Sequence, residues 1–392
     1  MDPADRLASP PRTAARKAHL PALDGLRGVA ILGVLLFHTG HLPGGFLGVD
    51  LFFALSGYLI TDLLLREAGA TGTVSLAAFW GRRVRRLLPA LALVLAVVTV
   101  VVRLAGEPDL VRTTLADGPW VQANLVNWHL LAESASYWDR FGPGRVFEHL
   151  WSIAVEEQFY LVWPVLVLLI ARSGRRVHAR VALAAVVISV ASVVLMAVLA
   201  DPADPTRVYT GTDTRAFSLL LGALAATAPV RKALSRLPGA VQLLPAAAVA
   251  VVWALADGMH SQWLFTGGLF AYSLTASALI GLCAAAPHGR VATVLAWKPL
   301  RWLGSVSYSL YLWHWPVIVL LSPERTLLVF AVSITLAALS KYLVEDPVRF
   351  RARWARGRRG VYAFTGVMLS LAILWLAVPA PPPPVVDLTG LT

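Results

Sequence analysis

The sequence predicts an all-α fold, a polytopic integral membrane bundle of transmembrane helices, and three observations support this class. Hydrophobic side chains make up 57% of the 392 residues. Only 14% of the residues are charged, whereas a water-soluble domain carries about 25%. Apolar runs of about 20 residues, the length that a helix needs to cross a bilayer core, recur along the whole chain.

Eleven segments have the length and composition of a transmembrane helix. In chain order they are 22–40, 48–66, 88–106, 149–171, 181–200, 214–229, 240–257, 264–286, 303–321, 325–345 and 360–379. The segment 214–229 is the least typical, because it is short and contains Arg215. The longest stretch between two predicted helices, 107–148, is rich in Trp, Tyr and Asn, and we expect it to form a lid or an interfacial segment.

The distribution of basic residues predicts the orientation of the bundle. With a cytoplasmic N-terminus, the segments on the cytoplasmic side contain 27 of the 34 Lys and Arg residues. Such an excess is typical of cytoplasmic loops, so we expect the N-terminus inside and the C-terminus outside a cell membrane. The net charge of +12 therefore reflects topology and lipid contact, and does not indicate a nucleic acid partner.

The two ends of the chain differ in composition from the predicted bundle. Residues 1–19 are polar and predict a cytoplasmic segment, and residues 351–379 predict a basic cytoplasmic loop with one further transmembrane helix. Residues 380–392 begin with a proline run and predict a stiff extracytoplasmic tail. The single cysteine, Cys283, excludes an intrachain disulfide framework and a cysteine-rich metal site.

Three ionisable residues lie on one face of the first predicted helix. At 100° and 1.5 Å per residue, Arg27 and His38 are only about 20° apart around the axis and about 16 Å apart along it. Asp24 lies on the same face. Charged groups inside a membrane are costly, so we expect this face to line a polar cavity; the alternative is a packing stripe whose members satisfy one another.

The fourth predicted helix begins with a second polar cluster. His149, Ser152, Glu156 and Tyr160 follow one flank of this helix, and Glu157 is adjacent. Two neighbouring carboxyl groups at a membrane boundary are costly unless they are protonated or paired. An ion pair that clamps the bundle and a role in binding a substrate both remain open.

Four arginines, Arg82, Arg83, Arg85 and Arg86, precede the third predicted helix on its cytoplasmic side. Such clusters usually interact with anionic lipid headgroups. Arginine also binds phosphate through two parallel hydrogen bonds, so a phosphate-rich ligand is the alternative.

Weaker signals lie on two other helices. Tyr311 and His314 share a face of the segment 303–321, and Asp50 lies at the outer mouth of 48–66. The sequence has no phosphate-binding loop, dinucleotide fingerprint or zinc-ligand spacing, so nucleotide hydrolysis and metal chemistry have no support.

Six motifs, in this order, resemble the membrane-bound acyltransferase-3 family, whose bacterial members O-acylate surface glycans, peptidoglycan, lipid-linked sugars and secondary metabolites. They are Leu23–Gly28 with His38, Gly48–Ile60, Phe79–Trp80 with the arginine run, His149–Tyr160, Ser307–His314 and Glu345–Pro347. The resemblance covers 20–350 and implies a ten-helix acyltransferase core, to which the last predicted helix is an addition. The chain is similar to the stand-alone form of the family, without a C-terminal esterase-like domain.

The resemblance also implies a reaction. The donor is expected to be a cytoplasmic acyl-coenzyme A, by default acetyl-coenzyme A, used as a co-substrate with no bound cofactor and no metal. The acceptor is expected to be a hydroxyl group of a carbohydrate, either a surface glycan, a lipid-linked sugar or a glycosylated metabolite. On this basis the four arginines become donor-binding candidates, because the coenzyme carries phosphates.

The resemblance assigns His38 as the general base or as an acyl relay, near the middle of the membrane. Arg27 would guide the pantetheine arm or polarise the thioester. A nearby carboxylate or a backbone carbonyl would orient the ring of His38. The side-chain candidates for this role or for binding the oxyanion are Asp24, Asp50, Glu156 and Glu157. Residues expected to bind the acceptor or to support the site are Asp50, His149, Ser152, Tyr160, Tyr311 and His314.

Two other functional classes could use the same buried charges. A transporter or proton-coupled exporter needs ionisable groups in the membrane, but the sequence has no internal repeat of the kind common in transporters. The spacing of Arg27 and His38 also favours the enzyme. A structural scaffold would leave both residues unexplained.

Overall fold

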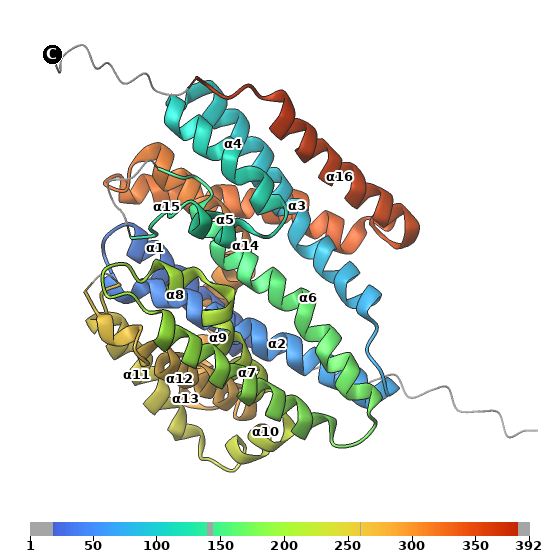
Figure 1. The fold of residues 1–392 in the computed structure, drawn as a ribbon. Coiled ribbons are helices and arrows are strands. Elements are labelled where there is room, and N and C mark those ends of the chain that lie inside the picture. Colours follow the sequence, from blue (N-terminus) through green and yellow to red (C-terminus); the bar gives the residue numbers. More distant parts are fainter. Residues whose placement is uncertain (1–18, 139–143, 259, 383–392) are drawn as a thin grey trace, which may run out of the picture.

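The computed structural model describes residues 19–138, 144–258 and 260–382. All regular secondary structure in these ranges is helical (Figure 1). The predicted terminal segments 1–19 and 380–392 lie almost entirely outside the described residues. The ranges that are described contain every predicted transmembrane segment.

The α-helices form the bundle as follows: α1 (Pro21–His38), α2 (Gly48–Thr71), α3 (Leu76–Ala105), α4 (Pro108–Gln122), α5 (Val126–Ala132), α6 (Trp151–Arg172), α7 (Val177–Leu199), α8 (Thr206–Thr210), α9 (Thr212–Ala225), α10 (Ala228–Leu234), α11 (Leu243–Leu255), α12 (Gly268–Ala285), α13 (Arg290–Leu295), α14 (Lys298–Leu321), α15 (Thr326–Leu339) and α16 (Gly357–Ala377). Helix α15 continues into π-helical turns at Ser340–Glu345 and Pro347–Arg351.

The membrane-spanning character of the bundle confirms the predicted fold class. In the described ranges, eight helices are long and apolar enough to cross a membrane, and the bent pair α9–α10 would make a ninth. Each of the eleven predicted segments is helical. Of the two that fall short of this criterion, α11 is too short, and α14 is 24 residues long but rich in Tyr, Trp, His and Ser.

The third predicted helix begins earlier than expected, and this changes the setting of the arginine run. Helix α3 starts at Leu76 instead of residue 88, with Ser75 as its N-cap, whose side chain accepts a hydrogen bond from the backbone of Ala78. Arginine is a good helix former, so the run continues the helix. The four arginines therefore lie on the turns of a helix, and helical periodicity separates their directions.

Helices α1 and α14 form the most extensive helix contact of the bundle, and glycine makes it possible. A Cβ atom on Gly28 would lie 2.2 Å from the carbonyl oxygen of Leu300, and one on Gly304 would lie 1.8 Å from that of Asp24. Small residues at such crossings let two backbones approach closely in a membrane. The crossing brings the polar face of α1 against that of α14.

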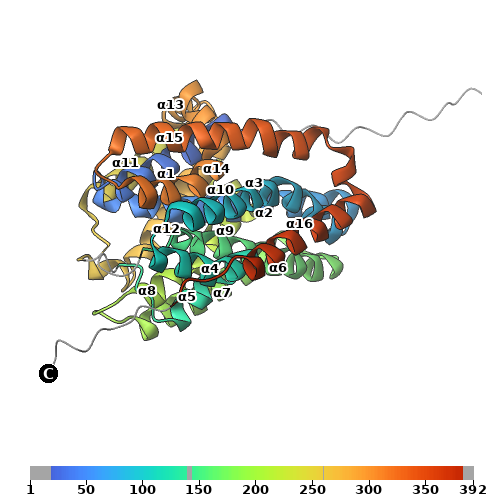
Figure 2. The ribbon, with the colours of Figure 1, turned by 90° about the horizontal axis from the view of Figure 1, so that it is seen from above.

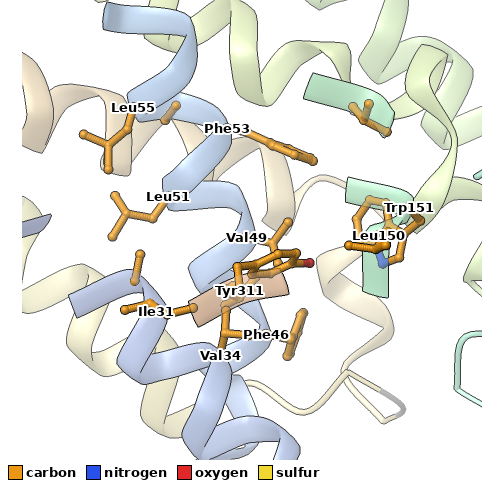
Figure 3. Packing of buried hydrophobic residues seen from close by; sticks show 14 of the residues in the cluster. Ile31, Val34, Phe46, Val49, Leu51, Phe53, Leu55, Leu150, Trp151 and Tyr311 are labelled. Carbon is orange, nitrogen blue, oxygen red and sulfur yellow. The ribbon is translucent and has the colours of Figure 1, made fainter. Parts of the chain in front are cut away.

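The hydrophobic core lies beside this crossing. Figure 3 shows Ile31 and Val34 of α1 near Leu51 and Val49 of α2, with Tyr311 of α14 among them. All of these side chains are at least 94% buried. Because interiors are close-packed, this core holds the three helices that carry Arg27, Ser56 and Tyr311 in fixed relative positions.

The stretch predicted as a lid or an interfacial segment contains two helices, α4 and α5, joined by a tight turn at Asn124. Helix α16 packs against α3 and α4 at the edge of the bundle (Figures 1 and 2). The indole of Trp375 on α16 donates a hydrogen bond of 2.7 Å to Gln122 of α4. The additional C-terminal helix is thus attached to the edge formed by α3 and α4.

Candidate active site

Two adjoining pockets in the bundle share part of their walls, and we refer to them together as the cleft. Their volumes are about 400 Å³ and about 460 Å³. They share five lining residues from α1, α2, α6 and α14, namely Arg27, Ser56, Ile153, Glu156 and Tyr308. One end of this cleft reaches the arginine run of α3, and we call it the arginine end. The other reaches Tyr311, beneath a group of histidines, and we call it the histidine end.

Helical periodicity divides the four predicted donor-binding arginines into two pairs. Arg83 and Arg86, three residues apart, both line the cleft. The guanidinium of Arg83 also lies over the ring of Tyr160, 5.0 Å from its centroid. Arg82 and Arg85 do not line the cleft; Arg82 is exposed and lies 3.5 Å from Glu67. Only Arg83 and Arg86 are therefore placed to meet a ligand in the cleft.

The middle of the cleft contains one cation and one carboxyl group, and a second carboxyl group lies toward the arginine end. Glu156 accepts hydrogen bonds from Tyr160 (2.6 Å) and Ser56 (3.0 Å), both to Oε2. Arg27 donates a hydrogen bond to Ser307 at 3.4 Å. Glu157 lines the cleft at the arginine end. Arg27 and Glu156 border both pockets, whereas Asp24 and His38, which were predicted to share a cavity-lining face with Arg27, do not line the cleft.

Tyr311 closes the cleft at the histidine end. Its hydroxyl lies 2.7 Å from the hydroxyl of Ser152 and donates to the backbone oxygen of His149 at 2.9 Å. Beyond it, the ring of His314 lies 5.3 Å from the ring of His149 and 5.1 Å from that of His38, centroid to centroid. The structure thus brings Ser152, Tyr311 and all three predicted site histidines together.

Two backbone carbonyls set the tautomers of the two histidines that contact each other. A carbonyl oxygen can only accept, so the Nδ1 atom that lies 3.0 Å from the oxygen of Val34 must carry the proton of His38. By the same argument, His314 is protonated at Nδ1, 2.7 Å from the oxygen of Tyr311. Its free Nε2 faces Nδ1 of His38 at 3.3 Å. The lone pair of His38 is therefore on Nε2, as a general base requires.

The free nitrogen of His38 points toward the segment between α5 and α6. The hydroxyl of Tyr137 lies 3.5 Å from Nε2 of His38, and the ring of Trp315 lies 4.8 Å from the imidazole. Sequence reasoning did not propose Tyr137 as a site residue, although the aromatic content of 107–148 was the signal that could have found it. A hydroxyl group near Nε2 occupies the position that an acceptor hydroxyl would need.

Two positional expectations are corrected by these contacts. His38 is the last residue of α1. Asp24 is about 21 Å from it along the axis and contacts His19 at 2.5 Å. None of the four carboxyl groups proposed to orient His38 hydrogen-bonds to it among the described residues, because the carbonyl of Val34 takes that role.

Asp50, which was expected to orient His38 or to bind the acceptor, forms an ion pair with Arg215 instead. Its Oδ1 lies 2.6 Å from a terminal nitrogen of Arg215 and accepts a 2.9 Å hydrogen bond from Ser218. Both charged side chains are fully buried, and the ring of Tyr209 lies 4.9 Å from the guanidinium. The pair joins α2 to α9, and it explains the arginine that made the segment 214–229 an untypical span.

A second buried carboxyl group, Asp117 of α4, supports the segment that covers His38. It lies 2.6 Å from Arg145 and 3.2 Å from His129. Arg145 also contacts Glu133, and its backbone oxygen accepts a hydrogen bond from the indole of Trp315. Burial raises the pKa of Asp117 above its ordinary value, against the opposing effect of Arg145 and His129.

Because of this raised pKa, we expect the contribution of Asp117 to the stability of the fold to depend on pH. A carboxyl group with a raised pKa binds its proton more tightly in the folded state, so its contribution to stability rises as the pH falls toward its unfolded pKa of about 3.9. We expect the melting temperature of the wild type, relative to Asp117→Asn, to rise between pH 7 and pH 4. A difference that stays constant, or falls, with decreasing pH would contradict this.

The fold and the cleft together define a class of protein: a polytopic helical membrane protein with a polar cleft that leads from arginines to histidines. Among the described residues, no three His, Cys, Asp or Glu side chains are arranged to hold a metal ion. Comparison with known sequences makes the class specific. The acyltransferase domain family matches residues 20–340, and the chain belongs to this family.

Several relatives are similar over most of this chain. YrhL of Bacillus subtilis is 39% identical over 362 residues, which are 87% of this chain and 56% of the relative. The peptidoglycan O-acetyltransferase OatA of Listeria monocytogenes is 34% identical over 357 residues, which are 85% of this chain and 56% of the relative. The O-acetyltransferase OatA of Staphylococcus aureus is 34% identical over 379 residues, which are 91% of this chain and 62% of the relative.

The chain spans about three fifths of the length of these curated relatives. No solved structure shows significant similarity to it.

Proposed function

We propose that this chain is a membrane O-acetyltransferase that transfers an acetyl group from acetyl-coenzyme A to a carbohydrate hydroxyl, with a peptidoglycan-type glycan as the first acceptor to consider. The observation that carries the proposal is the cleft between Arg83 and Arg86 at one end and Tyr311, beneath the histidines, at the other. The relatives named as O-acetyltransferases support the same chemistry, and family membership favours transfer over transport.

The arginine end suits the donor. Arg83 and Arg86 offer two guanidinium groups inside a cleft, and Arg binds phosphate in a bidentate manner. The excess of basic residues on the same side supports a cytoplasmic location for this end. A donor bound there would direct its thioester along the cleft toward Arg27, whose side chain borders both pockets and can stabilise negative charge on the carbonyl oxygen.

The histidine end suits the acceptor. Nε2 of His38 would take the proton of the acceptor hydroxyl, while the hydroxyl oxygen attacks the thioester carbonyl. The C–O bond forms, the C–S bond breaks, and the thiolate of the coenzyme leaves and takes the proton that His38 received from the acceptor. In a two-step variant, Nε2 of His38 first takes the acetyl group and then passes it to the acceptor.

Tyr311 lies between the cleft and His38, so donor and base meet only if its side chain moves. Its hydroxyl is held by Ser152 and by the backbone of His149. Rotation of this ring would extend the cleft to His314 and His38. His149, Ser152 and Tyr311 thus control passage from the cleft to the base, and Tyr160 and Ser56 hold Glu156 in the wall of the cleft.

A test of the donor site follows from the division of the arginines. We expect Arg83→Gln/Arg86→Gln to raise the KM for acetyl-coenzyme A at least tenfold, because each hydrogen bond to a charged group contributes about 1.5–3 kcal/mol. The matched control, Arg82→Gln/Arg85→Gln, removes the same charge outside the cleft and should leave KM within about twofold. Equal effects of both pairs would show that only net charge at the surface matters.

The reaction itself is tested with the purified protein in lipid. Labelled acetyl-coenzyme A is supplied with muropeptides, with a lipid-linked sugar, with a glycosylated small molecule, or with no acceptor. We expect labelled acetyl ester on at least one carbohydrate, at a rate well above hydrolysis. Intact donor in every arm, with a folded protein, would overturn the proposal.

A further inference from the structure

A second large groove lies at the end of the bundle, and it shares no lining residue with the cleft. Its volume is about 1030 Å³, and it lies between the residue before α1 and the helices α2, α10 and α12. Its lining residues are Leu20, Tyr58, Arg66, Ala228, Arg231, Lys232, Ser235, Gly281, Ala284 and Ala285. The groove therefore combines cationic side chains with small and apolar ones.

The charge of this groove is strongly positive. Arg66, Arg231 and Lys232 line it, and none of its described lining residues is acidic. One buried carboxylate, Asp62, lies 2.9 Å from Arg66 and 3.4 Å from Arg231. It fixes these two guanidinium groups in place but cannot neutralise three cations. The groove keeps an excess of about two positive charges for an anionic ligand.

Helix α10 has the properties of a helix that lies along a membrane surface. It is bent by 69° from α9, and none of its seven residues is buried. Another groove, of about 1220 Å³, borders the other side of α10, and its lining includes Arg176, His178 and Lys232. Lys232 thus lines both grooves.

The apolar part of the groove leaves room for hydrocarbon. Ala284 and Ala285 of α12 present only methyl groups, and Leu20 adds an aliphatic wall. Gly281 lets α10 approach, since a Cβ there would lie 2.5 Å from the side chain of Leu234. A phosphate ligand of a soluble compound would use only the cations, whereas a phospholipid would also use this apolar floor.

We propose that the groove between α2, α10 and α12 binds the headgroup phosphate of an anionic phospholipid, with α10 lying at the level of the headgroups. Basic pockets between transmembrane helices are typical binding sites for such headgroups. The lipid would tie α10 to the inner ends of α2 and α12, at a site separate from the cleft that the donor is proposed to use.

Native mass spectrometry of the full chain in neutral detergent tests this assignment. Phosphatidylglycerol is titrated against phosphatidylcholine, and the variant Arg231→Gln/Lys232→Gln is compared with wild type. The control Arg358→Gln/Arg359→Gln removes the same charge at the start of α16. We expect the groove variant to bind phosphatidylglycerol about 30-fold more weakly, which corresponds to ~1 kcal/mol for each cation, and the control to bind within about threefold of wild type.

Two further arms decide the source of the phosphate and the integrity of the variant. Inorganic phosphate and coenzyme A are offered as competitors, and neither should displace the lipid at tenfold excess. The melting temperature of the groove variant without lipid should lie close to that of wild type. Equal losses in both variants, or displacement of the lipid by a soluble phosphate compound, would overturn the proposal of a lipid site.

Discussion

Replacement of His38 by alanine is expected to lower the rate of acetyl transfer by about 10²–10⁴-fold, the usual contribution of a general base. The expectation rests on the tautomer that the structure defines: Nδ1 donates to the carbonyl of Val34, and Nε2 is left free beside Tyr137. Rates of acetyl ester formation, measured at saturating donor and acceptor, check this directly. The KM for acetyl-coenzyme A should change little, because His38 does not line the cleft.

The chain offers a matched control and a graded variant. His41 lies three residues beyond His38, is exposed, and its side chain lies 3.2 Å from the hydroxyl of Thr39, so His41→Ala should retain full activity. His314→Ala removes the imidazole 3.3 Å from Nδ1 of His38 but keeps the Val34 carbonyl, so a smaller loss is expected. Full activity of His38→Ala would show that the base is elsewhere.

The largest expected effect on stability belongs to the buried pair of Asp50 and Arg215. Loss of one partner from such a pair typically costs about 3–5 kcal/mol, because the other charge remains buried without compensation. We therefore expect Asp50→Ala to lower the free energy of unfolding by this amount. Thermal unfolding in lipid nanodiscs, followed by circular dichroism, measures the change.

A double substitution separates the ion pair from the space that it fills. Asp50→Leu/Arg215→Met replaces both charges with apolar groups, so it should recover much of the stability that Asp50→Ala loses. The exposed residue Glu324 provides the control, and Glu324→Ala should change stability by less than about 0.5 kcal/mol. A double variant less stable than Asp50→Ala would mean that the charges are required by their polar neighbours, Ser218 and Ser273, which both donate hydrogen bonds to Asp50.

The membrane fold could be predicted because the bilayer imposes a length on each span. Apolar runs of that length were the basis for predicting the eleven segments, and all eleven are helical in the structure. The start of α3 was missed because four arginines interrupt hydrophobicity without interrupting helical propensity. Helix α14 carries polar and aromatic residues over a length typical of a span, and three of them, Ser307, Tyr308 and Tyr311, line the cleft.

The site was predictable where it depends on one helix and unpredictable where two helices meet. Spacing along α1 placed Arg27 and His38 on one face, and spacing along α14 placed Tyr311 near His314. The partner of Asp50 lies 165 residues away in sequence, and no local pattern points to Arg215. Similarly, a backbone carbonyl was one of the two kinds of group expected to orient His38, but the sequence alone did not identify it as that of Val34.

The central claim is that one chain takes an acetyl group from a donor at the arginine end and delivers it to an acceptor at the histidine end. Sealed proteoliposomes with the protein in a single orientation test it, with labelled acetyl-coenzyme A on one side and a carbohydrate acceptor on the other. The account predicts labelled ester only when the donor faces Arg83 and Arg86 and the acceptor faces His38, and none with His38→Ala. Ester formation that requires donor and acceptor on the same side would contradict it.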